Sequence, residues 1–474
     1  MNEKKYSFGM IGLGTMGANL VLNISDHGFS VAGYDKDVLK VEALNKYAPE
    51  KNIFAFTDIA TFIHSLELPR VIMLLVPAGK IVDAVITDII PLITSNDIII
   101  DCGNSHFIDT QLRIDTLMKK QLHFMGLGVS GGETGARFGP SIMPGGEMAA
   151  YTRIEPMLNA IAAKVNGVPC TAYMGSGSAG HYVKMIHNGI EYALMQLIAE
   201  SYHLLKVYGG LTNEELNVVY SQWNKGKLQS FLIEITAAVF LQKDDAGPGM
   251  LLDVITDSAH QKGTGAWMSQ DAVNVQSPIP AIDAAVSQRI LSSMKEERVL
   301  AAGANKKETA ASIKGNKNDF ISQLEDALHA ALIITYAQGL EMLQNASTTY
   351  KYGTDIAKVA TIWRGGCIIR AAILENITEA YNKQKDLKNI MLSEQFSGQL
   401  NKEQYSLKGI LKTAINNAIP VPAFSACMNY YDSFYSSWLP ANLIQAQRDF
   451  FGAHTYERLD KPGIFHTNWN EKIQ

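Results

Sequence analysis

Up to about residue 130, short apolar runs alternate with longer stretches that have the spacing of amphipathic helices. The apolar runs predict β-strands at Phe8–Ile11, Ser30–Tyr34, Val71–Val76, Asp97–Asp101 and His123–Val129. Nearly continuous apolar strands separated by helices are typical of a parallel sheet that is covered on both faces. The pattern therefore predicts an α/β domain at the start of the chain.

After about Gly180 the pattern changes to long stretches of helical periodicity with few strand-like runs. The polar segment Asn305–Asp319 interrupts them and predicts an exposed loop or a helix junction. From Trp438 onward, Pro, Gly, aromatic and basic residues follow no clear period, which predicts an irregular tail on another surface. We therefore expect three parts, at residues 1–178, 179–437 and 438–474.

The composition narrows the class of protein. A chain of 474 residues with 47% hydrophobic content can bury the cores of two or three domains. Its 41 basic and 46 acidic residues give a net charge of −5, so no global field attracts nucleic acid or an acidic membrane. The longest apolar run, Val71–Val76, is far shorter than the ~20 residues that span a bilayer. The polar start, Met1–Ser7, leads directly into a strand and does not read as a secretory signal.

Cysteine usage points to a reducing compartment. Cys102, Cys170, Cys367 and Cys427 lie far apart and form no C-x-x-C pair. This spacing argues against a disulfide framework and against a zinc site. The cysteine usage therefore predicts a cytoplasmic protein. We find no persuasive cluster of carboxylates or of His and Cys for another metal, so we also expect no metal centre.

A glycine-rich turn directly follows the first predicted strand: Gly12-Leu13-Gly14-Thr15-Met16-Gly17. The helix-like run Ala18–Asp26 comes next, and the second strand ends in an acid, Asp35. Glycines here permit a tight turn and close approach to a pyrophosphate, which then sits at the helix N-terminus. The motif alone is weak and can be an ordinary turn, but this context favours a Rossmann-like dinucleotide-binding domain.

The residues after the second strand bear on the choice of cofactor. The Asp35 carboxylate can accept hydrogen bonds from a ribose 2′-OH but repels a 2′-phosphate. Asp37 adds a second negative charge, and Lys36 is the only positive charge directly beside these two residues. These residues favour NAD over NADP.

A polar stripe marks one predicted helix. Lys184, His187, Asn188, Glu191 and Tyr192 are spaced so that they share one helix face. A solvated stripe on an amphipathic helix is the ordinary interpretation. The remaining faces, however, are apolar, which is typical of a buried helix whose polar stripe lines a cavity. Buried Lys and Glu are costly unless they are paired or used for chemistry.

Two further segments, and the single residues Arg289, Arg448 and His454, are candidates for anion binding. The glycine-rich stretch Gly126–Gly146 contains Ser130-Gly131-Gly132 and can offer backbone N–H groups to a carboxylate or phosphate, or be a flexible turn. His260-Gln261-Lys262-Gly263-Thr264-Gly265 places a cation and a hydroxyl in a mobile, glycine-flanked loop, although a surface turn explains such a string as well. Single Arg residues can bind phosphate through two hydrogen bonds.

Several long strings resemble the 6-phosphogluconate dehydrogenase family, in the same order and over almost the whole chain. They are D-C-G-N-S at 101–105, G-V-S-G-G-E-T-G-A-R-F-G-P-S-I-M-P-G-G at 128–146, K-M-I-H-N-G-I-E-Y at 184–192, D-S-A-H-Q-K-G-T-G-A-W at 257–267 and A-N-L-I-Q-A-Q-R-D-F-F-G-A-H-T-Y at 441–456. The resemblance implies a dinucleotide-binding domain, a large all-helical domain that forms a homodimer, and a C-terminal tail that penetrates the partner subunit. It also implies a decarboxylating oxidation of 6-phosphogluconate to ribulose 5-phosphate.

The resemblance assigns roles to the candidate residues. Lys184 would take the 3-OH proton as hydride leaves for the nicotinamide and would then polarise the ketone while CO2 departs, and Glu191 would protonate C1. A desolvated Lys can have its pKa lowered, and a buried Glu can have its pKa raised, as these roles require. Substrate binding would fall to Asn104, Ser130, Gly131, Gly132, His187, Asn188, Tyr192, Lys262, Thr264 and Arg289, with Arg448 and His454 from the other subunit. Cofactor binding would fall to three groups of residues and to Asn104. The groups are Gly12 to Gly17 in the first turn, Asp35, Lys36 and Asp37 after the second strand, and Val76, Pro77 and Ala78.

The chain departs from the family's usual pattern at the cofactor end. Most members read G-L-A-x-M-G in the first turn and N-R-T after the second strand, whereas this chain has G-L-G-T-M-G and Asp35-Lys36-Asp37. Pro77 and Ala266 stand where Lys is frequent. NADP is the family's default cofactor, and these departures favour NAD instead.

Two alternatives remain open at this point. A β-hydroxyacid dehydrogenase shares the first turn, a Ser-Gly-Gly loop and a catalytic Lys, but lacks the phosphate set of Lys262, Arg289 and Arg448. A regulatory or structural protein that has lost catalysis would not be expected to keep both Lys184 and Glu191.

Overall fold

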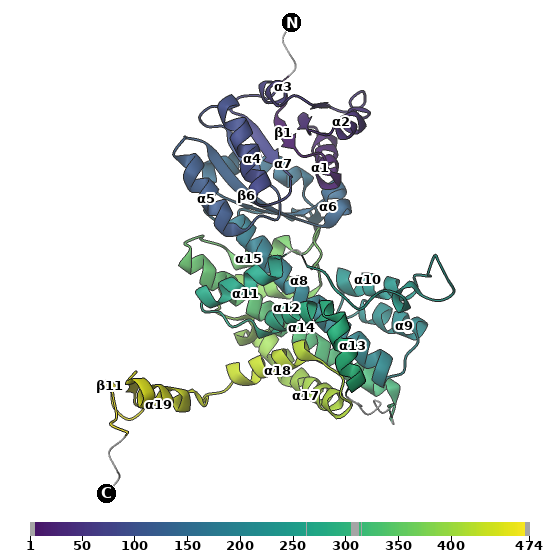
Figure 1. Cartoon of the computed structure of the whole chain (residues 1–474), viewed down its shortest axis with the longest axis vertical. Coiled ribbons are helices and arrows are strands. Elements are labelled where there is room, and N and C mark those ends of the chain that lie inside the picture. Colours follow the sequence, from purple (N-terminus) through teal and green to yellow (C-terminus); the bar gives the residue numbers. More distant parts are fainter. Residues whose placement is uncertain (1–4, 262, 305–311, 314, 470–474) are drawn as a thin grey trace. The chain divides into compact units, whose positions relative to one another are not determined.

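The computed structural model describes residues 5–261, 263–304, 312–313 and 315–469 (Figure 1). The chain divides into two compact units, Met1–Cys427 and Met428–Gln474, each of which is described by itself. The boundaries expected near residues 178 and 437 stay a prediction.

A seven-stranded sheet forms the start of the first unit, in the order β3-β2-β1-β4-β5-β6-β7. Neighbouring strands are parallel except β6 and β7, which are antiparallel. The strands are β1 (Phe8–Ile11), β2 (Val31–Tyr34), β3 (Ile53–Phe56), β4 (Val71–Leu74), β5 (Ile98–Asp101), β6 (His123–Ser130) and β7 (Ser141–Gly145). The reversal of strand order between β1 and β4 is where doubly wound sheets bind ligands.

Helices cover both faces of this sheet, as the apolar strands predict. Val71 and Met73 of β4 face a core shared with α1, α2 and α7, while Ile72 and Leu74 face a core shared with α3, α4 and α5. This alternation follows from the two-residue period of a strand. The helices are α1 (Thr15–Asp26), α2 (Val38–Asn45), α3 (Ile59–His64), α4 (Lys80–Ile89), α5 (Phe107–Met118), α6 (Gly132–Phe138) and α7 (Met148–Ile161).

All five predicted strands are present, with ends that differ by at most two residues, and two more strands complete the sheet. β3 was not predicted because Ile53–Phe56 is a short edge strand with Phe54 exposed. β7 was not predicted because Ser141–Gly145 lies inside the glycine-rich stretch. A small hairpin, β8 (Lys164–Val165) and β9 (Val168–Pro169), follows the sheet.

Helices form the rest of the first unit (Figure 1). The long helix α14 (Lys317–Thr349) packs against α8 (Ala179–His203) and α17 (Glu394–Asn416). The others are α9 (Asn213–Trp223), α10 (Phe231–Phe240), α11 (Thr264–Asn274), α12 (Pro280–Ser293), α13 (Lys295–Ala304), α15 (Ile356–Ile362), α16 (Ile373–Lys383) and α18 (Pro422–Phe434), the last of which continues past Cys427. Of the polar segment 305–319, residues 305–311 and 314 lie outside the described residues, and 317–319 already belong to α14.

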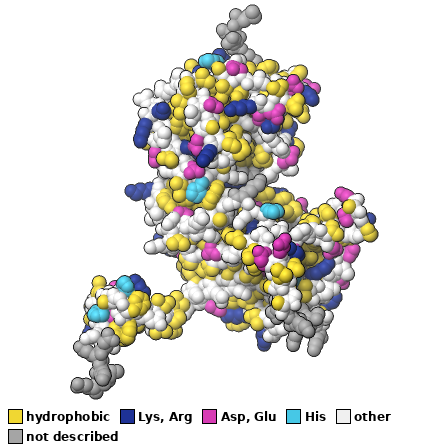
Figure 2. All heavy atoms as spheres, viewed as in Figure 1, with side chains coloured by type: hydrophobic (Ala, Val, Ile, Leu, Met, Phe, Trp, Pro, Cys, Tyr) yellow, Lys and Arg dark blue, Asp and Glu magenta, His cyan; other side chains and the backbone are white. Residues whose placement is uncertain are grey.

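The second unit is more regular than the irregular tail expected from the sequence. It contains helix α19 (Ala441–Gly452) and a hairpin of β10 (Tyr456–Glu457) and β11 (Ile464–Phe465). The fully buried Asp449 carboxylate connects the two elements, because it accepts hydrogen bonds from the Thr455 and Thr467 amides and from the Trp469 indole. The apolar side chains of the helix are exposed rather than packed into a core, and hydrophobic atoms are visible on this unit's surface (Figure 2).

Candidate active site

Glycines bring helix α8 unusually close to strands β6 and β7. A Cβ on Gly180 would lie 2.2 Å from the Gly126 carbonyl oxygen, and one on Gly145 would lie 2.1 Å from the Gly180 nitrogen. A Cβ on Gly128 would lie 2.6 Å from the Cβ of Lys184. Residues 126–146 are therefore not a single loop or flexible turn but β6, α6 and β7, and Gly126, Gly128 and Gly145 serve this close packing.

The predicted polar stripe is present on α8 and is largely buried. Lys184 is 8% exposed, His187 is fully buried and Tyr192 is buried, while Asn188 and Glu191 are partly exposed. The apolar residues of the same helix pack on its other faces, as the sequence pattern predicts. The stripe is therefore not a solvated helix surface.

Burial shifts the pKa values of the two ionisable candidates in opposite directions. Desolvation lowers the pKa of the Lys184 ammonium, and the nearby Glu191 carboxylate opposes only part of that effect. Desolvation likewise raises the pKa of Glu191, against the influence of Lys184 and Arg289. A Lys that is easier to deprotonate and a Glu that is easier to protonate are suited to act as a base and an acid.

His187 joins the stripe to the Ser-Gly-Gly segment. Its Nδ1 lies 3.1 Å from Asn188 Oδ1 and 3.7 Å from Glu191 Oε2, so Nδ1 faces acceptors and carries the proton. Burial and the neighbouring Lys184 hold the pKa of the imidazole well below its usual value, so the ring is neutral. Its Nε2 then accepts a hydrogen bond from the Ser130 hydroxyl at 3.2 Å.

The segment after α15 also reaches this site, which the sequence analysis did not predict. Gly131 has a φ of +111°, and a Cβ there would lie 2.5 Å from the Gly366 carbonyl oxygen. The Trp363 ring packs edge-on against His187, with centroids 5.6 Å apart. Burial raises the pKa of the Cys367 thiol to about 12, so this neighbour of Lys184 is uncharged. The sequence offers only Trp363 and Gly366 as a signal here, and a tryptophan and a glycine do not by themselves indicate an active site.

A cationic group lies at the other end of the stripe. The Arg289 guanidinium stacks on the Tyr192 ring, with Cζ 3.5 Å from the ring centroid. A Cβ on Gly265 would lie 2.6 Å from the same ring, so the start of α11 packs against it. Thr264 is the first residue of α11 rather than part of a loop, and it is buried. Lys262, predicted for the same role, lies outside the described residues.

A cavity of about 720 Å³ opens at the carboxyl ends of β1, β4 and β5. Its lining includes the expected Gly14, Thr15, Met16, Gly17, Val76, Pro77, Ala78 and Asn104. His106 and Trp267 also line it, with ring centroids 4.7 Å apart. Trp267 belongs to α11 and was not predicted as a cavity residue, although it ends one of the strings that carry the family resemblance.

The first glycine turn fits a dinucleotide. A Cβ on Gly12 would lie 2.5 Å from the Leu75 carbonyl oxygen, and one on Gly17 would lie 1.9 Å from the Gly12 carbonyl oxygen. These two glycines therefore serve the tight turn and the close packing of helix on strand. A Cβ on Gly14 would meet nothing within 4 Å, so this backbone is open toward the cavity at the start of α1. Gly12 and Leu13, which were also predicted to bind the cofactor, do not line the cavity.

The acidic residues after β2 are partly engaged by the backbone. Asp35 accepts hydrogen bonds from the Leu13 amide at 2.8 Å and from the Asp37 amide at 2.9 Å. Asp37 caps α2 by accepting from the Leu39 amide. Lys40 lies 3.6 Å from Asp35, whereas Lys36 pairs with Asp88 at 3.6 Å. The carboxylates of Asp35 and Asp37 thus keep Lys40, not Lys36, as their nearest ion-pair partner among the described residues.

Arg448 and His454 belong to the second unit. Arg448 is exposed on α19 and donates to Gln445 Oε1 at 3.0 Å, and His454 is exposed just after that helix. Neither residue is placed relative to the stripe on α8.

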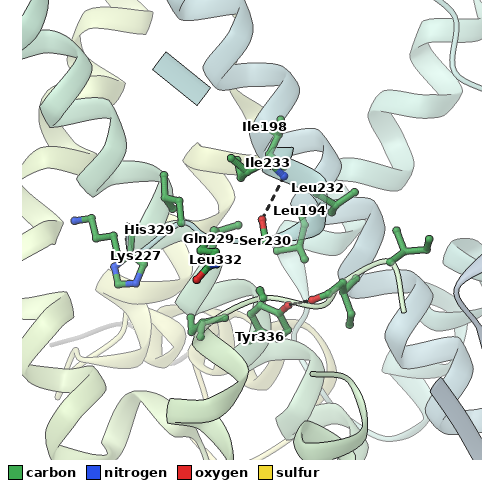
Figure 3. A pocket seen from close by; sticks show the side chains of 15 residues that line it. Leu194, Ile198, Lys227, Gln229, Ser230, Leu232, Ile233, His329, Leu332 and Tyr336 are labelled. Carbon is green, nitrogen blue, oxygen red and sulfur yellow. Dashed lines mark hydrogen bonds between the residues drawn. The ribbon is translucent and has the colours of Figure 1, made fainter. Parts of the chain in front are cut away.

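The pocket that is enclosed by helices next to this site is too small for a substrate. A pocket further along α8, lined by Leu194, Ile198, His329 and Tyr336 among others, has a volume of about 20 Å³ (Figure 3). That volume has room for roughly one water molecule. Within the described part of the chain, no three His, Cys, Asp or Glu side chains are grouped to hold a metal ion, and no helix is long and apolar enough to cross a membrane.

The family models match both parts of this architecture. Residues 7–175 match the model described as the "NAD binding domain of 6-phosphogluconate dehydrogenase", and residues 180–469 match "6-phosphogluconate dehydrogenase, C-terminal domain". The chain belongs to the 6-phosphogluconate dehydrogenase family. The match over the second half decides against a β-hydroxyacid dehydrogenase, which resembles mainly the first half.

Relatives from this family are similar over nearly their whole length. The chain is 48% identical to the Bacillus subtilis "6-phosphogluconate dehydrogenase, NADP(+)-dependent, decarboxylating", over 98% of this chain and 99% of that one. The decarboxylating 6-phosphogluconate dehydrogenase of Synechococcus elongatus is also 48% identical, with the same coverage. A solved structure of Plasmodium falciparum 6-phosphogluconate dehydrogenase superimposes with a TM-score of 0.95 at 41% identity, covering 98% of this chain and 100% of that one. That enzyme was studied in its apo form and with NADP+ and 6-phosphogluconate.

Proposed function

We propose that this chain oxidises and decarboxylates 6-phospho-D-gluconate to ribulose 5-phosphate and CO2, with reduction of NADP or NAD. The observation that carries the proposal is the pair Lys184 and Glu191 on one buried helix face, with pKa values shifted in opposite directions beside Ser130. Family membership and the full-length relatives support the same reaction.

Lys184 acts as the base in the first step. It is buried, and its lowered pKa makes the neutral amine accessible, so it can take the proton from the substrate's 3-OH. The nicotinamide, when bound, accepts the hydride from C3. The substrate is thereby oxidised to a 3-keto acid, and Lys184 becomes a cation next to the new carbonyl.

Lys184 and Glu191 then complete the decarboxylation. The protonated Lys184 hydrogen-bonds to the 3-keto oxygen and donates its proton there as the bond to the carboxyl carbon breaks, and the electrons of that bond form an enediol. Glu191, protonated because its pKa is raised, donates a proton to the carbon that becomes C1 of the product. Lys184 recovers the hydroxyl proton, which leaves ribulose 5-phosphate. The ammonium supplies the polarisation that a metal ion supplies in other oxidative decarboxylases.

The residues at one end of the α8 stripe bind the carboxylate end of the substrate, and those at the other end bind its 6-phosphate. Ser130, His187 and Asn188, with the backbone of Gly131 and Gly132, provide uncharged hydrogen-bonding groups for the carboxylate and hydroxyl end. Tyr192, Thr264 and Arg289 provide a hydroxyl, a helix N-terminus and a guanidinium for the 6-phosphate, and Lys262 is proposed to join them. Asn104 lines the cofactor cavity and is proposed to lie between cofactor and substrate.

We propose that Asp35 and Asp37 favour NAD over NADP. Both carboxylates lie at the end of β2, where the adenine ribose of a dinucleotide binds in this fold. Asp35 can still accept a bond from a 2′-OH, and both charges repel a 2′-phosphate. Lys36 pairs with Asp88, and Lys40, which lies within 3.8 Å of both carboxylates, offsets only one of the two charges, so a net negative charge remains.

We further propose a homodimer in which Arg448 and His454 complete the phosphate site of the partner. The exposed apolar side chains of α19, Leu443, Ile444, Phe450 and Phe451, support the burial of this unit in a second copy. All four cysteines are free and buried, which supports the cytoplasm as the place of action.

The proposal is tested by measuring products of the purified full-length chain with 6-phosphogluconate labelled with ¹³C at C1. Reduced cofactor, labelled CO2 and ribulose 5-phosphate should form in equal amounts. Cofactor reduction without labelled CO2, or turnover of simple β-hydroxyacids in preference to 6-phosphogluconate, would overturn it.

A further inference from the structure

Arg113 of α5 lies beneath two loops that line the cofactor cavity. It is buried, and its Nη2 donates to the Gly79 carbonyl oxygen at 3.1 Å while its Nε donates to Asp83 Oδ1 at 2.7 Å. Gly79 ends the loop that follows β4, and Asp83 is in the first turn of α4. Through these bonds the guanidinium holds the loop that contains Pro77 and Ala78.

The same guanidinium reaches the second loop through Asp101. Its Nη1 lies 3.4 Å from Asp101 Oδ2, in a carboxylate that is almost completely buried. Asp101 also accepts from the Gly103 amide at 3.0 Å and from the Ser105 hydroxyl at 2.6 Å, so it fixes the loop that carries Asn104. Arg113 thus connects both loops that line the cavity. Its hydrogen bonds go to Asp83, Asp101 and a backbone carbonyl, and none goes to a side chain that lines the cavity.

Asp101 is in turn connected to the helix that carries Lys184. Its carbonyl oxygen accepts a hydrogen bond from His181 Nε2 at 3.0 Å, so His181 Nδ1 is free to accept from the Thr110 hydroxyl at 2.7 Å. His181 is buried and lies one turn before Lys184 on the same face of α8. The chain of contacts therefore runs from the cofactor loops to the base.

We propose that Arg113, acting through Asp101 and His181, is a positioning residue that fixes the cofactor loops relative to Lys184. This inference rests on the proposed function of Lys184. Hydride and proton must leave adjacent atoms of one substrate carbinol, so the cofactor and the base have to be held in a fixed relation. A displacement of about 1 Å is enough to cost roughly 100-fold in rate.

The test compares Arg113→Met with the wild-type chain by cofactor binding, steady-state kinetics and the isotope effect with substrate deuterated at C3. Arg113→Met should lower kcat/KM for the cofactor roughly 10- to 100-fold. It should enlarge the primary isotope effect on kcat, because hydride transfer becomes limiting, and leave the Kd of 6-phosphogluconate within about twofold. Arg113→Lys, which keeps the charge and part of the hydrogen bonding, should show an intermediate loss and serves if the Met variant does not fold.

Arg70→Met is the matched control. Arg70 donates to the buried Asp97 at 2.8 Å, so it forms a similar ion pair at the amino ends of β4 and β5, opposite the cavity. Its replacement should lower the melting temperature with little change in the isotope effect. The inference is overturned if both Arg113 variants keep wild-type cofactor affinity and isotope effect, or change them no more than Arg70→Met. Absence of turnover in the wild-type chain would instead refute the proposed function.

Discussion

The Arg289 guanidinium lies over the Tyr192 ring, with its Cζ 3.5 Å from the ring centroid. This contact holds the cation in place, and the planar fork of a guanidinium suits two hydrogen bonds to one phosphate. Arg289→Met should lower kcat/KM for 6-phosphogluconate by roughly 10- to 150-fold, the range for a lost charged hydrogen bond. The slower turnover of unphosphorylated gluconate should change little. Equal losses on both substrates would show that Arg289 does not act on the phosphate.

The pH dependence should reveal two groups with opposite requirements. In the proposed mechanism, turnover needs neutral Lys184, whose fraction rises with pH, and protonated Glu191, whose fraction falls with pH. Their product gives a bell-shaped profile of kcat/KM. Glu191→Gln should lower kcat roughly 100- to 10,000-fold and should remove the decline at high pH, because only the Lys184 ionisation remains. A high-pH decline that persists in this variant would assign that limb to another group.

Cofactor selection should respond to a single charge after β2. Asp37→Ser keeps a side chain that can cap α2 but removes one carboxylate, so kcat/KM for NADP relative to NAD should rise roughly two- to fivefold. Asp355→Ser, at the corresponding cap of α15, is the control and should leave the ratio unchanged. Wild-type kcat/KM with both cofactors, measured at one salt concentration, should favour NAD. A large NADP advantage in the wild-type chain would refute the role given to Asp35 and Asp37.

The proposed sharing of active sites between two subunits predicts complementation between inactive variants. Lys184→Met lacks the base and Arg448→Met lacks the contribution of α19, so each homodimer should turn over poorly. Dissociated and reassembled mixtures should form hybrid dimers in which one site has both Lys184 and Arg448. Activity well above either parent is the expected result, together with a dimeric mass in solution. No recovery in mixtures that are shown to contain hybrids would place both residues in the same chain's site.

The sequence predicted the central part of this structure because each signal there is local. The parallel strands follow from runs such as Val71–Leu74, and the stripe on α8 follows from helical spacing around Lys184. Local signals could not reveal that the glycines of β6 and β7 permit contact with α8, since this role depends on residues far apart in the chain. Arg113 gave no signal at all, because a single Arg on an amphipathic helix usually lies on the surface.

Contacts between distant segments explain the remaining differences. Gly366 lies beside Gly131 and Trp363 packs on His187, although these residues are far apart in the sequence. For these residues the missing information is a packing partner rather than a local preference. Helix α19, by contrast, has Leu443, Ile444, Phe450 and Phe451 at helical spacing, a short pattern that the surrounding Pro, Gly and aromatic residues obscure.

The role of Lys184 as the base is the central claim, and one variant tests it most directly. Lys184→Met retains a long apolar stem of similar shape but cannot take or return a proton. Its rate of 6-phosphogluconate oxidation in a single turnover, followed by formation of reduced cofactor, should fall by roughly 100- to 10,000-fold. The Kd of 6-phosphogluconate should change only a few-fold, and Lys206→Met, at a partly exposed site that pairs with Asp253, should behave as wild type. Oxidation at a near-normal rate by Lys184→Met would contradict the account.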